Sequence, residues 1–369
     1  MSFSAESWLA HAGSSVVAGE PVVLPLVLTT TYVSAGELGD DYGYGRAGNP
    51  VWEALEAALG ALEDAEAVVF ASGQAASMAL MLALAKGRSR VVLPADGYYG
   101  ARVLADQLRP HGAEPVAVDQ QDLTGVKEAL TGAPSVLWAE TPTNPLLKVA
   151  DLDRLGELAS AAGAPMIVDN TVATALLQRP LDRGAAASLY SLTKAASGHS
   201  DVLLGAVVSR DAGLIAEVRS WRYTGGGIAG PAEAWLALRG LKTLPLRIER
   251  QSRNAQAIAE HLAGHPQVRA VHYPGVLTGA ARAVADAQMP SGFGPLLSFE
   301  VESAAAADAV VSASALIVPA TSLGGVESTW ERRARWPAET APAGLIRLSA
   351  GIELGSDLIA DIDAALGVL

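Results

Sequence analysis

Apolar residues recur along the chain in two patterns, one typical of helices and the other of buried strands. Helical spacing of apolar positions predicts helices over residues 51–62, 75–85 and 154–162. Short apolar runs with β-branched residues predict strands over residues 91–93, 135–139, 166–168 and 203–208. Because the predicted strands alternate with helices, we expect a mostly parallel sheet with helices on both faces.

The pattern changes after residue 231. One long helical segment is predicted over residues 232–264, with Pro245 inside it. Further strands are predicted over residues 268–273, 296–301 and 345–349, with helical patterns between them. The chain is therefore expected to divide into an irregular N-terminal arm, a large domain and a smaller C-terminal α/β domain, which cover residues 1–48, 49–245 and 246–369.

Composition and charge exclude several kinds of function. The 369 residues include no cysteine and six scattered histidines, so we expect no disulfide, no thiolate nucleophile and no bound metal. A net charge of −13 would repel a phosphate backbone, which argues against a nucleic-acid partner. The longest apolar stretch, residues 75–85, is too short to cross a membrane, and residues 1–13 do not resemble a signal peptide. We therefore expect a cytoplasmic protein with no membrane partner.

Several polar residues follow predicted strands, where an open α/β sheet gathers its ligands. Glu140 and Asp169 come directly after apolar runs, and Lys194 comes a few residues after another. Ser72 and Gly73 follow a further run and precede a helix. Each residue alone has an ordinary explanation as a turn residue, a helix cap or a solvated lysine. Together they indicate one site.

These residue types match the needs of pyridoxal 5'-phosphate (PLP), which has an aldehyde, a ring nitrogen that must stay protonated, and a phosphate. Lys194 can supply the amine, Asp169 the carboxylate, and Tyr98 is a candidate for the face of the ring. Phosphate donors are predicted among main-chain amides at the start of a helix and two hydroxyl groups, from Gly73, Gln74, Ser191 and Thr193.

A series of short motifs resembles the Cys/Met-metabolism, or trans-sulfuration, family of PLP enzymes, and the resemblance covers almost the whole chain. The motifs are Tyr-Gly-Arg-Ala-Gly-Asn-Pro at 44–50, Glu-Thr-Pro-Thr-Asn-Pro at 140–145, Asp-Asn-Thr at 169–171, Thr-Lys at 193–194, Arg-Gly-Leu-Lys-Thr-Leu at 239–244, Ser-Leu-Gly-Gly at 322–325 and Arg-Leu-Ser at 347–349. The resemblance implies the fold-type I, aminotransferase-like PLP-dependent transferase architecture, with a large parallel-sheet PLP-binding domain and a smaller C-terminal α/β domain.

The resemblance also implies residue roles. Lys194 would bind PLP through a Schiff base and move protons, Asp169 would pair with the ring nitrogen, and Tyr98 would stack on the ring and protonate the leaving group. The implied cofactor-binding residues are Tyr44, Arg46, Ser72, Gly73, Gln74, Tyr98, Asp169, Ser191, Thr193 and Lys194. The implied substrate-binding residues are Asn144, Ser322 and Arg347. Because Tyr44 and Arg46 would come from the neighbouring subunit, the resemblance implies a homo-oligomer whose active unit is a dimer, assembled into a tetramer.

Departures from the family pattern leave some assignments open. Tyr99 could replace Tyr98 as the ring partner, because the alignment there can slip by one residue. Gly100 stands where methionine γ-lyases often carry cysteine, and Thr321 stands where many cystathionine γ-lyases carry glutamate. The segment 330–336 contains three arginines. It either lines the entrance and attracts an acidic end of the substrate, or forms a salt-bridged surface turn.

The implied activity is γ-elimination on sulfur amino acids, of the cystathionine γ-lyase type, which converts L-cystathionine to cysteine, 2-oxobutanoate and ammonia. The alternative is γ-replacement, as in cystathionine γ-synthase or O-acylhomoserine sulfhydrylase, because both reactions use the same residues. A catalytically silent scaffold would be expected to lose Lys194, which is present. A dinucleotide-binding dehydrogenase is disfavoured, because the three glycines at 225–227 follow no clear strand and lack the required spacing.

Overall fold

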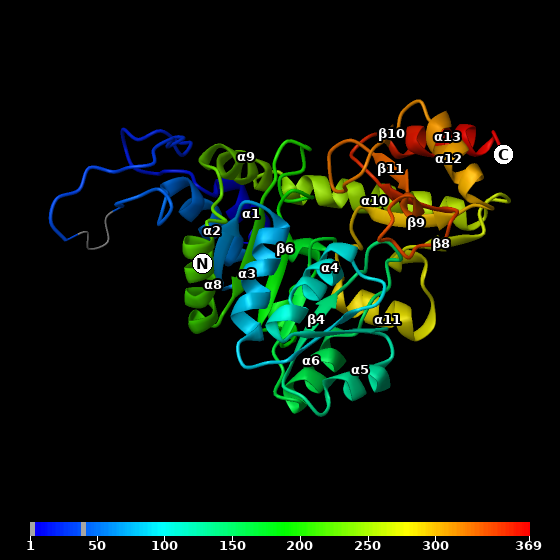
Figure 1. The fold of residues 1–369 in the computed structure, drawn as a ribbon. Coiled ribbons are helices and arrows are strands. Elements are labelled where there is room, and N and C mark those ends of the chain that lie inside the picture. The colour runs from blue at the N-terminus through cyan, green and yellow to red at the C-terminus, as the bar shows by residue number, and fades with distance from the viewer. Residues whose placement is uncertain (1–3, 38–41) are drawn as a thin grey trace.

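The structure is a computed structural model that describes residues 4–37 and 42–369. The predicted arm, residues 1–48, therefore includes two short stretches that lie outside the described residues. The chain builds two sheets with helices packed around them (Figure 1). Within the described part of the chain, no helix is long and apolar enough to span a bilayer.

The first sheet has seven strands in the order β1-β7-β6-β5-β4-β2-β3. Six of them run in the same direction, and β7 is antiparallel to both of its neighbours. The prediction of a mostly parallel sheet is therefore confirmed. Its strands are β1 (Glu66–Phe70), β2 (Arg90–Pro94), β3 (Glu114–Val118), β4 (Ser135–Glu140), β5 (Met166–Asp169), β6 (Ala187–Ser191) and β7 (Gly205–Ser209).

Helices cover both faces of this sheet, which explains why its central strands are apolar at nearly every position. On one face, alternate residues such as Val68 and Trp138 pack against three helices, α3 (Gly73–Ala85), α4 (Tyr99–Gln107) and α8 (Ala212–Gly225). On the other face, residues such as Val69 and Leu137 pack against α2 (Pro50–Glu63), α9 (Pro231–Leu241), α5 (Leu123–Leu130) and α6 (Leu152–Ala161). The sheet is thus a buried, rigid platform for the residues at its edge.

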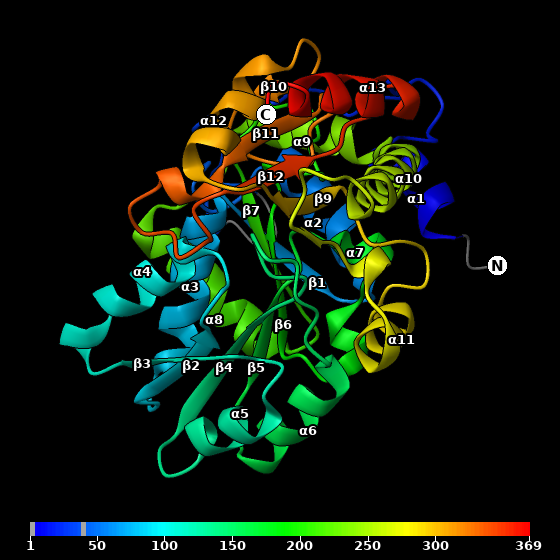
Figure 2. The same ribbon diagram turned by 90° about the vertical axis from the view of Figure 1, so that its right-hand side faces the viewer.

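The second sheet has five strands in the order β10-β11-β12-β9-β8, and it lies beyond the carboxyl edge of the first sheet (Figure 2). The long helix α10 (Leu244–Ala263) packs on it together with α12 (Ala304–Ala313) and α13 (Gly355–Leu366). Its strands are β8 (Ala270–His272), β9 (Leu296–Glu300), β10 (Val318–Pro319), β11 (Thr329–Arg332) and β12 (Leu345–Ser349). The short helices α1 (Ala5–His11), α7 (Thr174–Leu177) and α11 (Gly279–Gln288) complete the fold.

Two predicted elements differ from the structure. The single helix over residues 232–264 is wrong, because the chain forms α9 and α10 with a break at Lys242 and Thr243. Pro245 lies in the first turn of α10, where its missing N–H costs no helical hydrogen bond. The predicted strand over residues 203–208 begins only at Gly205, and Leu203 is exposed.

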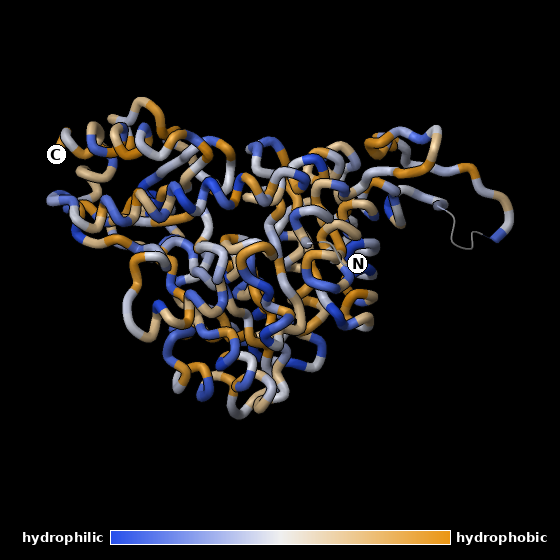
Figure 3. Tube along the Cα trace, turned by 180° about the vertical axis from the view of Figure 1, so that it is seen from behind, coloured by the Kyte–Doolittle hydropathy of each residue, from blue (hydrophilic) through white to orange (hydrophobic). Residues whose placement is uncertain are grey.

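Within the predicted arm, helix α1 packs on the body through Leu9, and the described residues that follow it extend away from the molecule (Figure 1). This extension carries apolar side chains that are largely exposed in the isolated chain. The hydropathy colouring of Figure 3 shows apolar residues along the same segment. Val16, Leu28 and Val33 are 98%, 72% and 107% exposed, respectively. Such a run of solvent-exposed apolar residues is typical of a surface that another chain covers.

Candidate active site

The predicted site residues converge on one cavity of about 360 Å³ at the carboxyl edge of the first sheet, roofed by residues from the second sheet. All of them line it except Tyr44 and Arg46: the lining includes Ser72, Gly73, Gln74, Tyr98, Asn144, Asp169, Ser191, Thr193, Lys194, Ser322 and Arg347. No group of three or more metal-ligating side chains occurs among residues 4–37 and 42–369.

One end of the cavity is built to hold an anion. Ser72 caps α3, and its Oγ accepts a hydrogen bond from the N–H of Ala75 at 3.1 Å. The first amides of a helix have no acceptor within the helix, so those of Gly73 and Gln74 can be used by a ligand. The Gln74 side chain donates instead to the Gly100 carbonyl at 3.1 Å, which leaves its main-chain amide for the site.

This anion-binding end depends on a close approach of β7 to the start of α3. A Cβ atom on Gly205 would lie 2.4 Å from the Ser72 carbonyl oxygen and 2.6 Å from the Gly73 Cα. Only glycine therefore allows the two segments to come together here. On the other side, the Thr193 hydroxyl exchanges hydrogen bonds with the Leu204 backbone, which fixes the turn that follows β6.

Two carboxylates lie side by side on the floor of the cavity. Asp169 and Glu140 are register partners on the parallel strands β5 and β4. Burial raises the pKa of both carboxyls above their usual values, and the charge of Asp169 raises that of Glu140 further. Asp169 is held by the N–H of Thr171 at 3.0 Å. A buried pair of this kind provides strong electrostatic stabilisation for a cation placed in the cavity.

Glu140 also organises the residues around it. Its Oε2 accepts from the backbone N–H of Tyr98 at 2.7 Å, and its Oε1 accepts from the backbone N–H of Asn144 at 2.7 Å. Tyr98 and Tyr99 both line the cavity, with ring centroids 5.1 Å apart. Burial raises the pKa of Tyr98, and the nearby charges that affect it include Asp169. Gly100 leaves room for the Tyr98 ring, because a Cβ there would lie 2.4 Å from a ring carbon.

Lys194 projects into the cavity from the turn after β6. Its Nζ donates a 2.8 Å hydrogen bond to the Oγ of Ser322. Burial lowers the pKa of Lys194 to about 8, and the nearby Arg347 and Arg333 lower it as well. The neutral amine, which is the nucleophilic form, is therefore accessible close to neutral pH.

The other end of the cavity is built around Arg347 on β12, which is buried. Its Nη1 donates to the Oδ1 of Asn144 at 3.0 Å, and its Nη2 donates to the Ser322 carbonyl at 2.9 Å. The same Nη2 contacts Glu331 at 2.7 Å. A guanidinium fixed in this way can bind a carboxylate with a defined orientation.

Ser322 lies between the two ends of the site. Its hydroxyl accepts a hydrogen bond from Lys194, and its carbonyl accepts one from Arg347. Its φ of 89° is in the left-handed region, which is uncommon for serine and concentrates at functional sites. Gly324, at φ 79°, follows closely, and a Cβ on it would lie 2.5 Å from the backbone nitrogen of Ala195. The Ser322–Gly325 turn therefore packs directly against the backbone next to Lys194.

Residues 329–340, called the rim segment below, contain the arginines that were expected either to line the entrance or to form a salt-bridged surface turn. Their contacts in the structure distinguish these two interpretations. Arg332 points outward and pairs with Asp308 on α12 at 2.7 Å, so the structure does not place it at the entrance. Arg333 and Trp336 do line the cavity. Arg333 is buried between Glu331 and Glu339, at 2.7 and 2.6 Å. The segment is thus salt-bridged, as one interpretation held, but its central ion pairs are buried rather than on the surface.

Tyr44 and Arg46 lie on the arm, outside this cavity. Tyr44 is half exposed, and Arg46 donates to the Tyr223 carbonyl at 3.0 Å and stacks over the Tyr223 ring at 4.4 Å. Neither residue lines the cavity of its own chain, which agrees with the expectation that both act in a neighbouring subunit. That expectation stays a prediction.

Several residues that support the site were not predicted from the sequence. Arg247 on α10 donates to the Ala195 carbonyl at 2.7 Å and thereby fixes the turn that carries Lys194. Gly205 permits the close approach described above, and Glu331 contacts Arg347. A charged residue at an apolar position of a helix or strand was the available signal for Arg247 and Glu331.

The donor set of the cavity fits PLP. The amine of Lys194, the carboxylate of Asp169 and the helix N-terminus at Gly73 surround one space, and each matches a different group of the cofactor. The buried carboxylate pair gives an independent reason, because the protonated ring nitrogen would supply the cation that this pair lacks.

Comparisons with known proteins agree with this geometry. Residues 6–367 match the family model described as Cys/Met metabolism PLP-dependent enzyme. A Streptomyces coelicolor protein named provisionally as a cystathionine gamma-lyase is 44% identical, over 94% of this chain and 89% of its own. The cystathionine gamma-synthase of Mycobacterium tuberculosis is 40% identical over 94% of this chain and 92% of its own. The crystal structure of a cystathionine gamma-lyase from Micromonospora echinospora superposes with a TM-score of 0.93, at 40% identity, over 99% of this chain and 100% of that chain.

Proposed function

Because this chain belongs to the Cys/Met metabolism PLP-dependent enzymes, which act on carbon–sulfur bonds, we propose that it catalyses γ-elimination of L-cystathionine. With one water molecule, L-cystathionine gives cysteine, 2-oxobutanoate and ammonia. The bond between the γ-carbon and sulfur breaks, and the sulfur leaves as the thiol of cysteine. The observation that carries this proposal is the cavity in which Ser322 accepts hydrogen bonds from both Lys194 and Arg347.

PLP, when bound, supplies an electron sink that stabilises negative charge at the α-carbon of an amino acid. In our proposal Lys194 attaches the cofactor and then moves the α-proton, which its low pKa of about 8 favours. Asp169 would hold the ring nitrogen in its protonated form. Tyr98 would lie against the ring, and its phenol would protonate the departing sulfur. The Tyr98 phenol lies near enough to Asp169 to be affected by its charge, and the main-chain N–H of Tyr98 is fixed by Glu140; both observations support Tyr98 over Tyr99.

At the other end, we assign Arg347 to the α-carboxylate of the substrate, with Asn144 and Ser322 beside it. These two residues hold the guanidinium from two directions, which restricts how a carboxylate can approach. The reacting carbon would then lie between Arg347 and Lys194. This arrangement favours binding of an α-amino acid in one orientation.

The distal half of cystathionine would face the rim segment. Arg333, which the rim contributes to the cavity, already donates to two carboxylates. Elimination requires only that the distal half leave, whereas replacement requires an incoming thiol to be held in place. A rim whose buried arginine is already paired therefore favours elimination over γ-replacement, and it favours relaxed selectivity that also admits homoserine derivatives.

We further propose that the active unit is a dimer, assembled into a tetramer, in which Tyr44 and Arg46 reach the neighbouring site. The exposed apolar arm supports this assembly. Residues 49–245 would form the PLP-binding domain and residues 246–369 the C-terminal domain, with the boundary in the first turn of α10, just after the break between α9 and α10. We expect the enzyme to act in the cytoplasm.

The proposal is tested by incubating the PLP-loaded protein with L-cystathionine and identifying the products. 2-Oxobutanoate and cysteine in equal amounts are expected. Pyruvate as the main keto acid would indicate β-elimination instead. Net formation of cystathionine from cysteine and an O-acylhomoserine, faster than its breakdown, would assign the protein to γ-replacement.

A further inference from the structure

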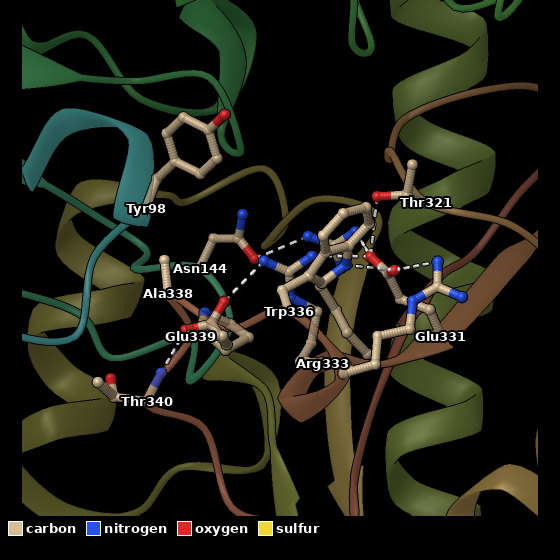
Figure 4. Close-up of polar contacts among 12 residues, drawn as sticks. Tyr98, Asn144, Thr321, Glu331, Arg333, Trp336, Ala338, Glu339 and Thr340 are labelled. Atoms are coloured by element: carbon tan, nitrogen blue, oxygen red, sulfur yellow. Dashed lines mark hydrogen bonds and ion pairs between the residues drawn. The ribbon is translucent and has the colours of Figure 1, made fainter. Parts of the chain in front are cut away.

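A single buried carboxylate connects the rim segment to the substrate end of the cavity. Glu331 on β11 is 1% exposed, and both of its oxygens accept several donors (Figure 4). The donors to Oε1 are Thr321 Oγ1 at 2.9 Å, Arg333 Nη1 at 2.7 Å and Arg347 Nη2 at 2.7 Å. The donors to Oε2 are Trp336 Nε1 at 3.0 Å and Arg335 Nη2 at 2.7 Å.

From this arrangement we propose that Glu331 is a positioning residue for substrate binding, which holds the Arg347 guanidinium charged and aimed at the cavity. The inference rests on the proposed function, because it takes Arg347 to bind the α-carboxylate of the substrate. Glu331 itself does not reach the cavity surface, since it is absent from the lining residues. It acts through Arg347, with which it shares a hydrogen bond.

The fold fixes this contact. Strands β11 and β12 are antiparallel neighbours, and Glu331 and Arg347 are direct partners in their register. Directly opposed residues on one face have Cβ atoms about 4.5–5.5 Å apart, so the pair cannot separate without disrupting the sheet. Both side chains are buried, which protects their attraction from screening by salt.

Arg347 needs a carboxylate because of its surroundings. Its other acceptors, the Asn144 amide oxygen and the Ser322 carbonyl, are neutral. A second guanidinium, that of Arg333, lies on the far side of Glu331 and donates to the same oxygen. Without Glu331, Arg333 would keep its ion pair with Glu339, but Arg347 would have no carboxylate in direct contact and would face a second buried cation. Three of the five N–H donors of Arg347 are used in these contacts, which leaves the remainder for a ligand.

The electrostatics agree with this geometry. Burial lowers the pKa of Arg347 to about 9, Arg333 lowers it further, and Glu331 opposes both effects. Burial alone would raise the pKa of the Glu331 carboxyl, but Arg347 and the hydrogen bonds to it keep that pKa below its usual value. The two groups therefore stabilise each other's charge.

The test compares Glu331→Gln with the wild type as PLP-loaded proteins. Affinity for glycine, which has an α-carboxylate but no leaving group, is measured from the change in visible absorption, and KM and kcat are measured for L-cystathionine. We expect the Kd for glycine and the KM to rise roughly 10- to 100-fold, by loss of a charge-assisted contact, while kcat changes less than about 3-fold. Asp308→Asn is the matched control, because it breaks the exposed ion pair of Arg332 on the same strand. It should leave the Kd for glycine, the KM and the kcat unchanged.

A double-mutant cycle separates positioning from a merely structural role. In an Arg347→Gln background, Glu331→Gln should have no further effect on the Kd for glycine, because its partner is already gone. Additive effects, or an unchanged Kd in the single variant, would overturn the inference. If Glu331→Gln does not fold, Glu331→Asp replaces it and should raise the Kd for glycine by a smaller factor; a loss confined to kcat would contradict the proposal. Altered glycine binding in a protein that does not cleave cystathionine would disprove the proposed substrate and leave this inference intact.

Discussion

The Nζ of Lys194 lies 2.8 Å from the Oγ of Ser322, so a residue next to the first sheet and a residue from the loop between β10 and β11 meet inside one cavity. These two residues are separated by 128 positions in the sequence. The contact places Lys194, the proposed covalent anchor, beside Ser322, whose carbonyl also accepts a hydrogen bond from Arg347.

Lys194→Ala should abolish turnover of L-cystathionine, with a loss of at least about 10²–10⁴-fold, because it removes both the anchor of PLP and the proposed proton carrier. Borohydride reduction of the wild-type protein, followed by peptide mapping, should find the cofactor on Lys194. Lys127→Ala, at an exposed position on α5, is the control and should retain activity. Cofactor on a different lysine would refute the assignment.

Covalent capture of PLP by the cofactor-free protein should depend on pH near 8 rather than near the ordinary value for lysine. The neutral amine attacks the aldehyde, and burial lowers the pKa of Lys194 to about 8, so the capture rate should rise from pH 7 to 9 and level off above. Arg347→Gln removes a neighbouring cation that lowers this pKa, and should shift the rise to higher pH. Stopped-flow absorbance measures the rate. A profile that still rises steeply above pH 10 would contradict the lowered pKa.

Tyr98→Phe and Tyr99→Phe distinguish the two candidate ring partners. If the Tyr98 phenol protonates the departing sulfur, its removal should lower kcat about 10²-fold or more, while Tyr99→Phe has a small effect. Steady-state kinetics with L-cystathionine provides the measurement. The reverse order of the two effects would mean that Tyr99 is the functional residue.

Gly205→Ala should destabilise the fold and weaken PLP binding together, because the new Cβ would lie 2.4 Å from the Ser72 carbonyl. Crowding of this kind costs about 1–3 kcal/mol in the free energy of unfolding. Gly225→Ala is the control, since nothing lies within 4 Å of a Cβ there. Thermal melting and PLP titration measure both effects. A stable Gly205→Ala protein with normal PLP affinity would show that the close approach is unnecessary.

Tyr44→Ala and Lys194→Ala should each be inactive alone and regain part of the activity after the two proteins are refolded together. In a mixed dimer, one site would contain neither substitution and the other would contain both, if Tyr44 acts in the neighbouring subunit. Activity of the mixture is compared with that of each variant refolded alone. Full wild-type activity in a sample shown to be monomeric would disprove the shared site.

The sequence predicts most of the site because its residues lie in short motifs at the ends of strands. Helices and strands with strong apolar periodicity, such as α2 and β12, are confirmed nearly to the residue. The edge strand β3 was not predicted, because it pairs only with β2, is partly exposed and contains Pro115. The break between α9 and α10 was missed because apolar spacing continues through it, and the backbone change at Thr243 leaves no mark on that spacing.

Contacts that depend on the three-dimensional fold could not be predicted in this way. Glu331 resembles any charged residue of an arginine-rich segment until the register of β11 and β12 brings it opposite Arg347. Arg247 stands out only as a charged residue at an apolar position of a helix until α10 is packed against the turn at Ala195. Both residues contact chain segments that are distant in sequence, so local patterns do not show what they bind.

The position of β12 in the second sheet has a consequence for biosynthesis. Arg347 lies in a strand held between β11 and β9, and all three are translated long after the turn that carries Lys194. As the polypeptide emerges from the ribosome, the segments that carry Gly73, Asp169 and Lys194 are available well before the strand that carries Arg347. A nascent chain therefore cannot form the complete cavity until β12 has been translated.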